Sequence, residues 1–517
     1  MDPDQRDAGG RAAGSDFLQL DIAQAPPGRR TDWLTDRLRT AIADGTLPLG
    51  SRLPPTRVLA ADLHVSRGLV TEAYQRLTES GHLATRGRHG TIVVAAPVAP
   101  ATDPIPAATP PPSPPATRSG ARTAAIRTPF AGPPSDGVVD SLRTVPCRFD
   151  LSPGVPDLAA FPRTAWLRAE RAVLDGVAPG DLGYGDPQGA LVLRRAVAGW
   201  LARNRGIRAD PAEVVIVAGV AQAIALLGGL LREDGIDRLA VEDPGSLGAR
   251  QQLAYGKLTT VPVPVDAGGL RVDALRASGV RVVVTTPAHQ FPTGVVLDGE
   301  RRRDLLAWAG EGGLIIEDDY DAEHRYDRPA VPALRAMLPE RICHTGSVSK
   351  LLAPALRVGW LLVPQTLRER VIAAKRYTDL GNAVLPQLVL AHLMDSGDLE
   401  RHLRFVRRRH QRRRDAMLDA IRTRLPGATV HGAAAGLHLT VTFDAAFPDT
   451  ALAEAALDAG VKVHPLSWHR IRPGPPGLVL GYAATAPAHL AEAVGVLAAA
   501  LGGLTGSGRV PPHGTGT

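Results

Sequence analysis

The chain of 517 residues is short of several residue types, and each shortage excludes a class of protein. Its two cysteines, Cys147 and Cys343, are too few for a disulfide framework or a cysteine-ligated metal site, and they suit a reducing compartment. No stretch approaches 18 consecutive apolar residues, so we expect no membrane span. Residues 1–14 are polar and lack the apolar core of a secretory signal. These absences together predict a cytoplasmic protein.

Lysine is scarce as well, and it occurs only at positions 257, 350, 375 and 462. Arginine supplies the remainder of the 59 basic residues. The net charge of +7 and the isoelectric point of about 9.8 are a weak indication of a polyanionic partner. If a primary amine carries chemistry here, there are four candidates for it.

The length exceeds what one hydrophobic core usually holds, so we expect at least two domains. Two of the five predicted segments are ordered: a compact unit over 29–94, and a larger region over 148–505 in which short apolar runs alternate with helix-length segments. A Pro/Ala/Thr-rich stretch over 95–147 predicts a semi-stiff linker between them. Residues 1–28 and the glycine-rich tail over 506–517 are predicted to be disordered.

The smaller unit has the pattern of a helix-turn-helix followed by a hairpin. Apolar residues spaced by four predict a first helix that ends before Pro48. Thr56 and Ser66 are the predicted N-caps of two further helices, which a tight turn joins. The segment His82–Val94 predicts a β-hairpin whose basic, glycine-rich tip can contact phosphates.

This unit resembles the GntR-type winged helix. The matching residues are Ile42–Gly45, Gly50–Pro54, Arg57–Ala60, Val65–Arg67, Ala73, Tyr74, Leu77, Gly90 and Thr91. The resemblance implies binding to double-stranded DNA, with the start of the third helix in the major groove. The DNA-contacting residues that it implies are Arg57, Ser66, Arg67, Thr71 and, in the wing, Arg86, Arg88 and His89. The alternative is a small helical domain with a solvated basic edge.

The larger region predicts an α/β fold with a parallel sheet. Its strand-like runs include 214–217, 239–241, 282–284 and 314–316, each followed by a helix-length segment. Sheets of this kind bind ligands at the carboxyl ends of their strands. Residues directly after these runs are therefore the candidates for a site.

One such residue is Lys350, which stands three residues after Ser347 and seven before Arg357. A lysine amine forms a Schiff base with an aldehyde cofactor, and a hydroxyl and a guanidinium can both bind that cofactor's phosphate. The S-x-x-K spacing also occurs in β-lactamases, so the motif alone leaves both readings open.

Two other strand ends carry matching groups. Asp318 follows the run at 314–316, where a carboxylate can keep a pyridine nitrogen protonated, and Tyr320 can donate to a ring hydroxyl oxygen. Residues 219–222 lie between the run at 214–217 and a helix, where backbone N–H groups can hold phosphate.

Residues 148–505 resemble the fold type I, class I/II aminotransferases, in the branch called MocR-type regulators. The motifs that carry the resemblance are Tyr184–Gly189, Glu242–Gly245, His289–Gly294, Glu317–Asp321 and Gly346–Lys350. The resemblance implies that pyridoxal 5′-phosphate is the cofactor and that the chain forms a homodimer. It implies the following site: Lys350 for the Schiff base, Asp318 on the pyridine nitrogen, Tyr320 on the ring O3′, Ser347 and Arg357 on the phosphate with the backbone of Gly219, Val220, Ala221 and Gln222, and Tyr184 on the phosphate of the neighbouring subunit's cofactor.

The sequence departs from its relatives at several places. Val220 and Ala221 replace polar residues of the phosphate cup, and Ser246 stands where a tyrosine commonly stacks on the ring. Phe291 replaces the asparagine of active aminotransferases. The late strand 478–482 lacks the arginine that binds a substrate carboxylate, for which Arg470 and Arg472 are candidate substitutes. We therefore expect the cofactor site to be kept and transamination to be inefficient.

Three hypotheses follow. The first is a dimeric DNA-binding transcriptional regulator that senses pyridoxal 5′-phosphate, or its aldimine with an amine or amino acid. The second is a working aminotransferase with an accessory winged helix, and the third is a DNA-binding protein with a scaffold-only second domain. The arginine run over 401–414 predicts a solvated helix face, His289 a positioning residue, and the spacing of His, Cys and Asp predicts no metal site.

Overall fold

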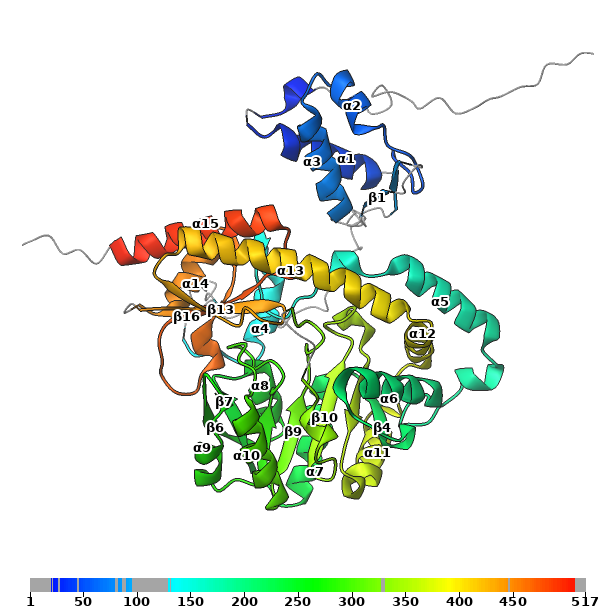
Figure 1. Cartoon of the computed structure of the whole chain (residues 1–517), viewed down its shortest axis with the longest axis vertical. Coiled ribbons are helices and arrows are strands. Elements are labelled where there is room, and N and C mark those ends of the chain that lie inside the picture. The colour runs from blue at the N-terminus through cyan, green and yellow to red at the C-terminus, as the bar shows by residue number, and fades with distance from the viewer. Residues whose placement is uncertain are drawn as a thin grey trace, which may run out of the picture. The chain divides into compact units, whose positions relative to one another are not determined.

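The computed structural model describes residues 20, 22–26, 28–43, 46–79, 82–85, 90–94, 129, 130, 132–326, 331–444 and 447–506. The chain divides into two compact units with the boundary between residues 124 and 125. Figure 1 labels many of the helices and strands of the two units.

The first unit is three helices and a short hairpin. Helices α1 (Arg30–Ala43), α2 (Thr56–Asp62) and α3 (Arg67–Glu79) precede strands β1 (Leu83–Thr85) and β2 (Thr91–Val93), which pair antiparallel. One core joins them, built from Leu34, Leu38, Ile42, Leu59, Val70, Leu77 and Val93 among others. Helix α3 presents the predicted apolar stripe to this core, because its buried positions recur every three or four residues.

The two predicted N-caps have different outcomes. Ser66 precedes α3, and its Oγ accepts a hydrogen bond from the backbone N–H of Leu69 at 3.3 Å, as a cap does. Thr56 is not a cap: it is the first residue of α2, and Pro55 takes the cap position without a side-chain hydrogen bond. The prediction failed because Pro55, pre-set for the extended backbone before a helix, moved the start of the helix forward by one residue.

The second unit is built on an eight-stranded sheet. Its strands are β4 (Val214–Val217), β5 (Arg238–Asp243), β6 (Thr259–Asp266), β7 (Gly269–Leu270), β8 (Val282–Thr285), β9 (Leu314–Asp318), β10 (Ile342–Ser347) and β11 (Gly359–Leu362). They lie in the order β4-β11-β10-β9-β8-β5-β6-β7. The central strands from β10 to β6 are parallel, as the sequence predicts, whereas β11 runs antiparallel to both of its neighbours.

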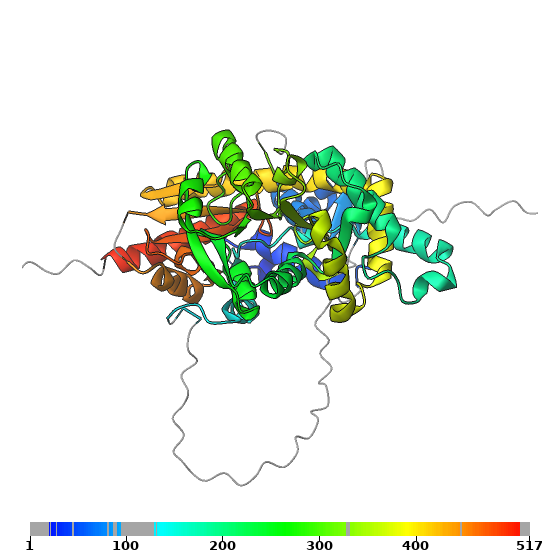
Figure 2. The same ribbon diagram turned by 90° about the horizontal axis from the view of Figure 1, so that it is seen from below.

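Helices cover both faces of this sheet, as can be followed in Figures 1 and 2. On β8, Val282 and Val284 pack toward one face and Val283 toward the other, which is the alternation expected of a strand that is buried on both sides. The first face packs against α7 (Val220–Glu233), α8 (Leu247–Tyr255) and α11 (Gln365–Asp379). The second packs against α5 (Arg163–Gly176), α6 (Leu191–Arg205), α9 (Val272–Ala277), α10 (Gly299–Gly310) and α12 (Val384–Asp395).

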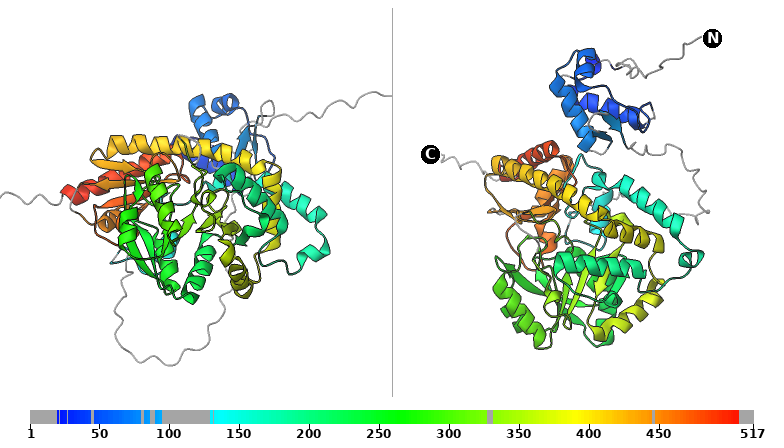
Figure 3. Two further views of the ribbon diagram at one scale, coloured as in Figure 1. Left: turned by 60° about the horizontal axis from the view of Figure 1, so that its bottom comes forward. Right: turned by 45° about the vertical axis from the view of Figure 1, so that its right-hand side comes forward.

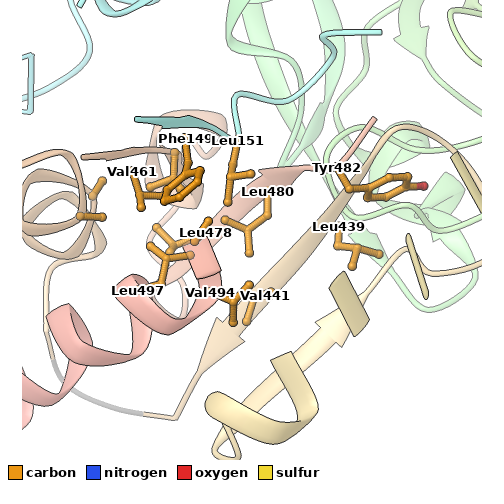
Figure 4. Close-up of a cluster of buried hydrophobic side chains, with 14 of the residues drawn as sticks. Phe149, Leu151, Leu439, Val441, Val461, Leu478, Leu480, Tyr482, Val494 and Leu497 are labelled. Atoms are coloured by element: carbon orange, nitrogen blue, oxygen red, sulfur yellow. The ribbon is translucent and has the colours of Figure 1, made fainter. Parts of the chain in front are cut away.

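A smaller sheet carries the C-terminal part of the chain. Strands β12 (Ala428–His431), β13 (His438–Phe443), β16 (Gly477–Gly481) and β15 (His464–Pro465) lie in that order, with α13 (Asp398–Arg424), α14 (Asp449–Asp458) and α15 (Pro487–Gly506) packed around them. Strand β3 (Phe149–Asp150) pairs in parallel with β14 (Val461–Lys462), and Figure 4 shows Phe149 within the same apolar cluster as the sheet residues.

Helices α13 and α15 run side by side (Figure 3). Residues Pro487–Leu504 of α15 reach the length and hydropathy that a membrane span has. However, Leu490, Ala493, Val494 and Leu497 are buried in the core beneath the smaller sheet. The helix therefore has a place in the domain's core.

The predicted linker over 95–147 extends too far. Residues 129, 130 and 132–147 belong to the second unit, and helix α4 (Val138–Thr144) lies among them. Phe130, Val138 and Leu142 are buried in the core of the smaller sheet. A segment with few apolar residues can still be ordered when those residues are buried in the core of another part of the domain. The composition of the segment alone does not reveal this burial. Residues 95–128 and 131 lie outside the described residues.

Two other expectations need correction or comment. Within the segment predicted to be disordered, Leu20 packs against the first unit's core and Ile22–Gln24 form a 3₁₀ turn; residues 1–19 and the tail beyond 506 lie outside the described residues. The arginine run on α13 is not one solvated face, because Arg409 Nε and Arg413 Nη1 both lie 2.8 Å from Oδ2 of the buried Asp157.

Candidate functional site

The carboxyl ends of β4, β9 and β10 meet at one edge of the large sheet, with β11 between β4 and β10. Thr345 of β10 pairs with Asp318 of β9, and Ser347 pairs with Gly359 of β11. Gly359 in turn pairs with Val217, the last residue of β4. This register brings the segments after β4, β9 and β10 together, which is where such sheets bind ligands.

A cavity of about 720 Å³ opens at this edge. Eight of the predicted site residues line it: Lys350, Asp318, Tyr320, Ser347, Arg357, Gly219, Val220 and Ala221. Chain segments more than a hundred residues apart thus contribute to one site.

Lys350 follows β10 and points into the cavity. Its Nζ donates a hydrogen bond to the carbonyl oxygen of Gly154, a residue with φ of +76°. The positive φ favours glycine at position 154, and a Cβ there would lie 3.0 Å from that Nζ, so the amine would have to move slightly. Burial lowers the pKa of the Lys350 amine below its usual value, an effect that the carboxylate of Asp321 partly offsets. A larger share of uncharged, nucleophilic amine follows.

Asp318 ends β9 and opens onto the same cavity. Burial raises the pKa of its carboxyl to about 7, and the negative charges of Asp319 and Asp321 add to this effect. A cation that entered the cavity beside Asp318 would offset both causes and favour the carboxylate. The site is therefore prepared for a positively charged partner.

His289 contacts the Tyr320 hydroxyl from the side away from the cavity. The Tyr320 hydroxyl lies 3.0 Å from His289 Nδ1, which is also 2.9 Å from Asp321 Oδ2. His289 is buried and does not line the cavity. A positioning role for His289 remains the prediction, because the ring contacts Tyr320 and Asp321 but does not face the cavity.

Backbone and guanidinium groups gather after β4. Gly219 has φ of +85° and precedes α7, whose first N–H groups have no intrahelical acceptor. Arg357 lies beside it: a Cβ at position 219 would be 3.4 Å from Arg357 Nη1, and Nη2 donates to the Ala218 carbonyl oxygen. With the Ser347 hydroxyl, these groups suit an anion such as phosphate.

Two predicted residues lie outside the cavity. The side chain of Gln222 turns away, since its Oε1 accepts from the Ala218 N–H at 2.7 Å and its Nε2 donates to Asp379 at 2.6 Å. Tyr184 is 95% exposed and touches no part of the cavity in its own subunit.

The predicted DNA contacts can be placed in part. Arg57, Ser66, Arg67 and Thr71 are all exposed, on or just before α2 and α3. The wing residues Arg86, Arg88 and His89 lie outside the described residues.

Sequence reasoning missed part of the cavity wall. Arg143 of α4, Gly154 after β3, His464 of β15 and His469 of the turn that follows β15 all line it. None of them lies in a motif of the large domain, and α4 falls in a stretch with the composition of a linker. By contrast, the candidate carboxylate partners Arg470 and Arg472 do not line the cavity, and their guanidinium groups donate to the Pro475 and Pro262 carbonyl oxygens.

Comparison with known families and proteins agrees with this architecture. The model of the bacterial regulatory proteins of the gntR family matches residues 31–93, and that of the class I and II aminotransferases matches residues 149–497. The chain is 33% identical to the probable rhizopine catabolism regulatory protein MocR of Rhizobium meliloti, over 92% of this chain and 95% of that protein. The chain belongs to the MocR-type transcriptional regulators.

Other relatives support the membership. This MocR-type regulator is 31% identical to the pyridoxine biosynthesis transcriptional regulator PdxR of Corynebacterium glutamicum, over 84% of this chain and 88% of that one. Among solved structures it resembles the kynurenine aminotransferase of Pyrococcus horikoshii, with a TM-score of 0.66, 26% identity and coverage of 72% of this chain and 95% of that one.

The fold of this MocR-type regulator is that of enzymes that use pyridoxal 5′-phosphate, and the residues present fit that group. Lys350 supplies an amine, Asp318 an acid at a strand end, and Gly219 with Arg357 a place for phosphate. Within the part of the chain that the structure describes, no group of three His, Cys, Asp or Glu side chains is arranged to hold a metal ion.

Proposed function

We propose that this MocR-type regulator binds pyridoxal 5′-phosphate through Lys350 and that occupancy of the cavity, by the cofactor alone or with an amine, changes its binding to DNA. The observation that carries the proposal is that Lys350 and Asp318, from adjacent strands, line one cavity together with Arg357. The bound cofactor supplies an electrophilic carbonyl and an electron-withdrawing ring.

Each of the chain's groups has a distinct task in this proposal. Lys350 would hold the cofactor's aldehyde end through its Nζ. Asp318 would balance the charge of a protonated ring nitrogen, and Tyr320, whose hydroxyl contacts His289, would donate a hydrogen bond to O3′. Ser347, Arg357 and the backbone after Gly219 bind the phosphate.

The proposal places the regulator in the cytoplasm as a homodimer on double-stranded DNA. The exposure of Tyr184 leaves it free to reach a neighbouring subunit's cofactor. Arg57, Ser66, Arg67 and Thr71 would contact DNA together with the wing residues Arg86, Arg88 and His89. The two DNA-binding units of a homodimer would then require paired half-sites spaced by multiples of a helical turn, about 34–36 Å.

The first experiment is a visible absorption spectrum of the purified full chain with added pyridoxal 5′-phosphate. After removal of unbound cofactor, we expect the absorption band of a cofactor–lysine adduct in wild type, its loss in Lys350→Ala, and its retention in the exposed control Lys257→Ala. A band that survived in Lys350→Ala would contradict the role of Lys350. Steady turnover of an amino acid with a keto acid would favour the aminotransferase alternative instead.

The second part of the test is DNA binding. Gel-shift titrations use a duplex from the region upstream of the regulator's own gene, with wild type and Lys350→Ala, each with and without pyridoxal 5′-phosphate. We expect the cofactor to change the affinity of wild type and to leave that of Lys350→Ala unchanged. Equal titrations in all four conditions would show that the cavity does not control DNA binding.

A further inference from the structure

The cavity has one wall that the cofactor-binding residues do not use. Helix α4 contributes Asp136, Gly137, Val139, Asp140 and Arg143 on or beside it, and His464 and His469 lie next to the smaller sheet. Since these residues take no part in holding the cofactor under the proposed function, they face whatever shares the cavity with it.

Among the described residues that line the cavity, the cationic side chains are Lys350, Arg357 and Arg143. Lys350 is assigned to the cofactor aldehyde and Arg357 to its phosphate. The two histidines do not add positive charge, because burial lowers the pKa of His464 to about 4 and that of His469 well below its ordinary value. Arg143 is therefore the one remaining cation of the wall.

The Arg143 guanidinium is available to a ligand. Its Nη1 lies 2.5 Å from Asp140 Oδ1, but the two side chains are 69% and 75% exposed, so their ion pair is screened and weak. Its charge nevertheless acts on both Lys350 and His464, which places it within electrostatic reach of the reactive amine. A guanidinium can bind a carboxylate through two parallel hydrogen bonds and still keep a neighbouring acid.

His464 adds a second observation at the same wall. Its side chain is only 5% exposed, and its Nδ1 has no hydrogen-bond partner among the described residues. Buried polar atoms are seldom left unpaired unless a ligand or a water completes them. An uncharged imidazole suits a polar ligand group next to the one that Arg143 binds.

We propose that the effector is an amine that bears a carboxylate, and that Arg143 of α4 binds this carboxylate. This inference rests on the proposed function, because the cofactor bound to Lys350 would take the amine end. Arg143 thus replaces the arginine that the strand β16 lacks, and it does so from an element outside the aminotransferase motifs.

The test uses pairs of probes that differ by one carboxylate: L-phenylalanine with phenethylamine, and γ-aminobutyrate with propylamine. Each probe is titrated into full-length protein freed of excess pyridoxal 5′-phosphate, and the change in the visible band gives a half-saturating concentration. In wild type we expect at least one of the two amino acids to have a half-saturating concentration about tenfold lower than that of its matching amine. This difference is equivalent to about 1.4 kcal/mol in binding free energy.

Three variants locate the effect. Arg143→Gln should remove the preference for the carboxylate, whereas Asp140→Asn, which frees Arg143, should keep or increase it. The control Arg148→Gln changes an exposed arginine that does not line the cavity and should behave as wild type. Equal titrations within both pairs in wild type, no response to any probe, or a preference that survives Arg143→Gln would each overturn the inference. Absence of the band itself would instead refute the proposed function, on which the inference depends.

Discussion

The surroundings of Asp318 change the acidity of its carboxyl group. Its carboxyl has a pKa of about 7 against an ordinary value of 3.8, because it is buried beside other acids. Without the cofactor, the native state therefore holds a proton that the unfolded chain releases near pH 4. The stabilisation that this provides is complete below pH 3.8 and is lost as the pH rises through about 7.

We therefore expect cofactor-free wild type to lose stability relative to Asp318→Asn as the pH rises from about 4 to about 7, and to change little above that. The relative loss should be a few kcal/mol, at about 1.4 kcal/mol per pKa unit. Urea unfolding of both proteins at several pH values measures it, with the exposed Asp175→Asn as a control. Parallel pH profiles for wild type and Asp318→Asn would show that the Asp318 carboxyl is not perturbed.

Local motifs allowed most of the large domain's site residues to be predicted. Lys350, Asp318 and Gly219 each follow a recognisable strand, and parallel strands place their ends at one edge. Arg143 and His464 could not be predicted in this way, because the packing of remote elements brings them to the cavity. The side chain of Gln222 likewise follows a remote partner, because it donates to Asp379, 157 residues further along, while the predicted role of its backbone stays a prediction.

At the scale of single elements, helix α3 depends on the residue before it. The Ser66 hydroxyl accepts from the N–H of Leu69 and so satisfies one of the helix's unpaired donors. Ser66→Ala should lower the stability of the first unit by about 1 kcal/mol. Calorimetry of the full chain measures this in the first unit's transition.

Thr71→Ala is the matched control for the cap. Its Oγ1 bonds back to the Arg67 carbonyl oxygen within the helix, an interaction that contributes little to stability. Equal effects of the two substitutions would mean that Ser66 does not act as a cap. Both residues are proposed DNA contacts, so stability is compared in the absence of DNA.

The segment around α4 offers a second prediction at this scale. Phe130 is buried and stacks on Trp468, with ring centroids 5.3 Å apart. Phe130→Ala should therefore destabilise the second unit by roughly 3 to 5 kcal/mol. The half-exposed Leu158→Ala serves as the control in urea unfolding. If residues 129–147 were a linker, as their composition predicts, Phe130→Ala would be neutral.

For the whole molecule, the decisive question is whether two subunits share each site. Tyr184→Ala should weaken binding of pyridoxal 5′-phosphate about tenfold, because the cofactor's phosphate loses a hydrogen bond from the neighbouring subunit. The equally exposed Tyr377→Ala should bind as wild type does. Fluorescence or absorbance titration of each full-length variant measures the affinity.

Mixing variants distinguishes a shared site from an internal one. Lys350→Ala lacks the amine and Tyr184→Ala lacks the phenol, so a mixed dimer has one complete site only if Tyr184 acts across the interface. After subunit exchange we expect tight cofactor binding to reappear in part of the mixture. Binding no better than in the separate variants would place Tyr184 outside the partner's site.

The domain organisation could be predicted where the composition of the chain changes, as it does at the two domains that the family models match. The prediction of a linker failed at the end of that stretch, because Phe130, Val138 and Leu142 are buried against residues that are remote in the sequence. A fragment meant to fold independently as the second unit therefore has to begin before Phe130. A fragment that begins at residue 148 would lose Phe130, Val138 and Leu142 from its core.

Among the described residues of the second unit, α4 is the first helix in chain order, and it lines the ligand cavity. A ligand held by Arg143 would contact this N-terminal helix of the second unit directly. The effect of the ligand would then begin at the end of the second unit that follows the winged helix in the sequence, and it would need no path through the large sheet.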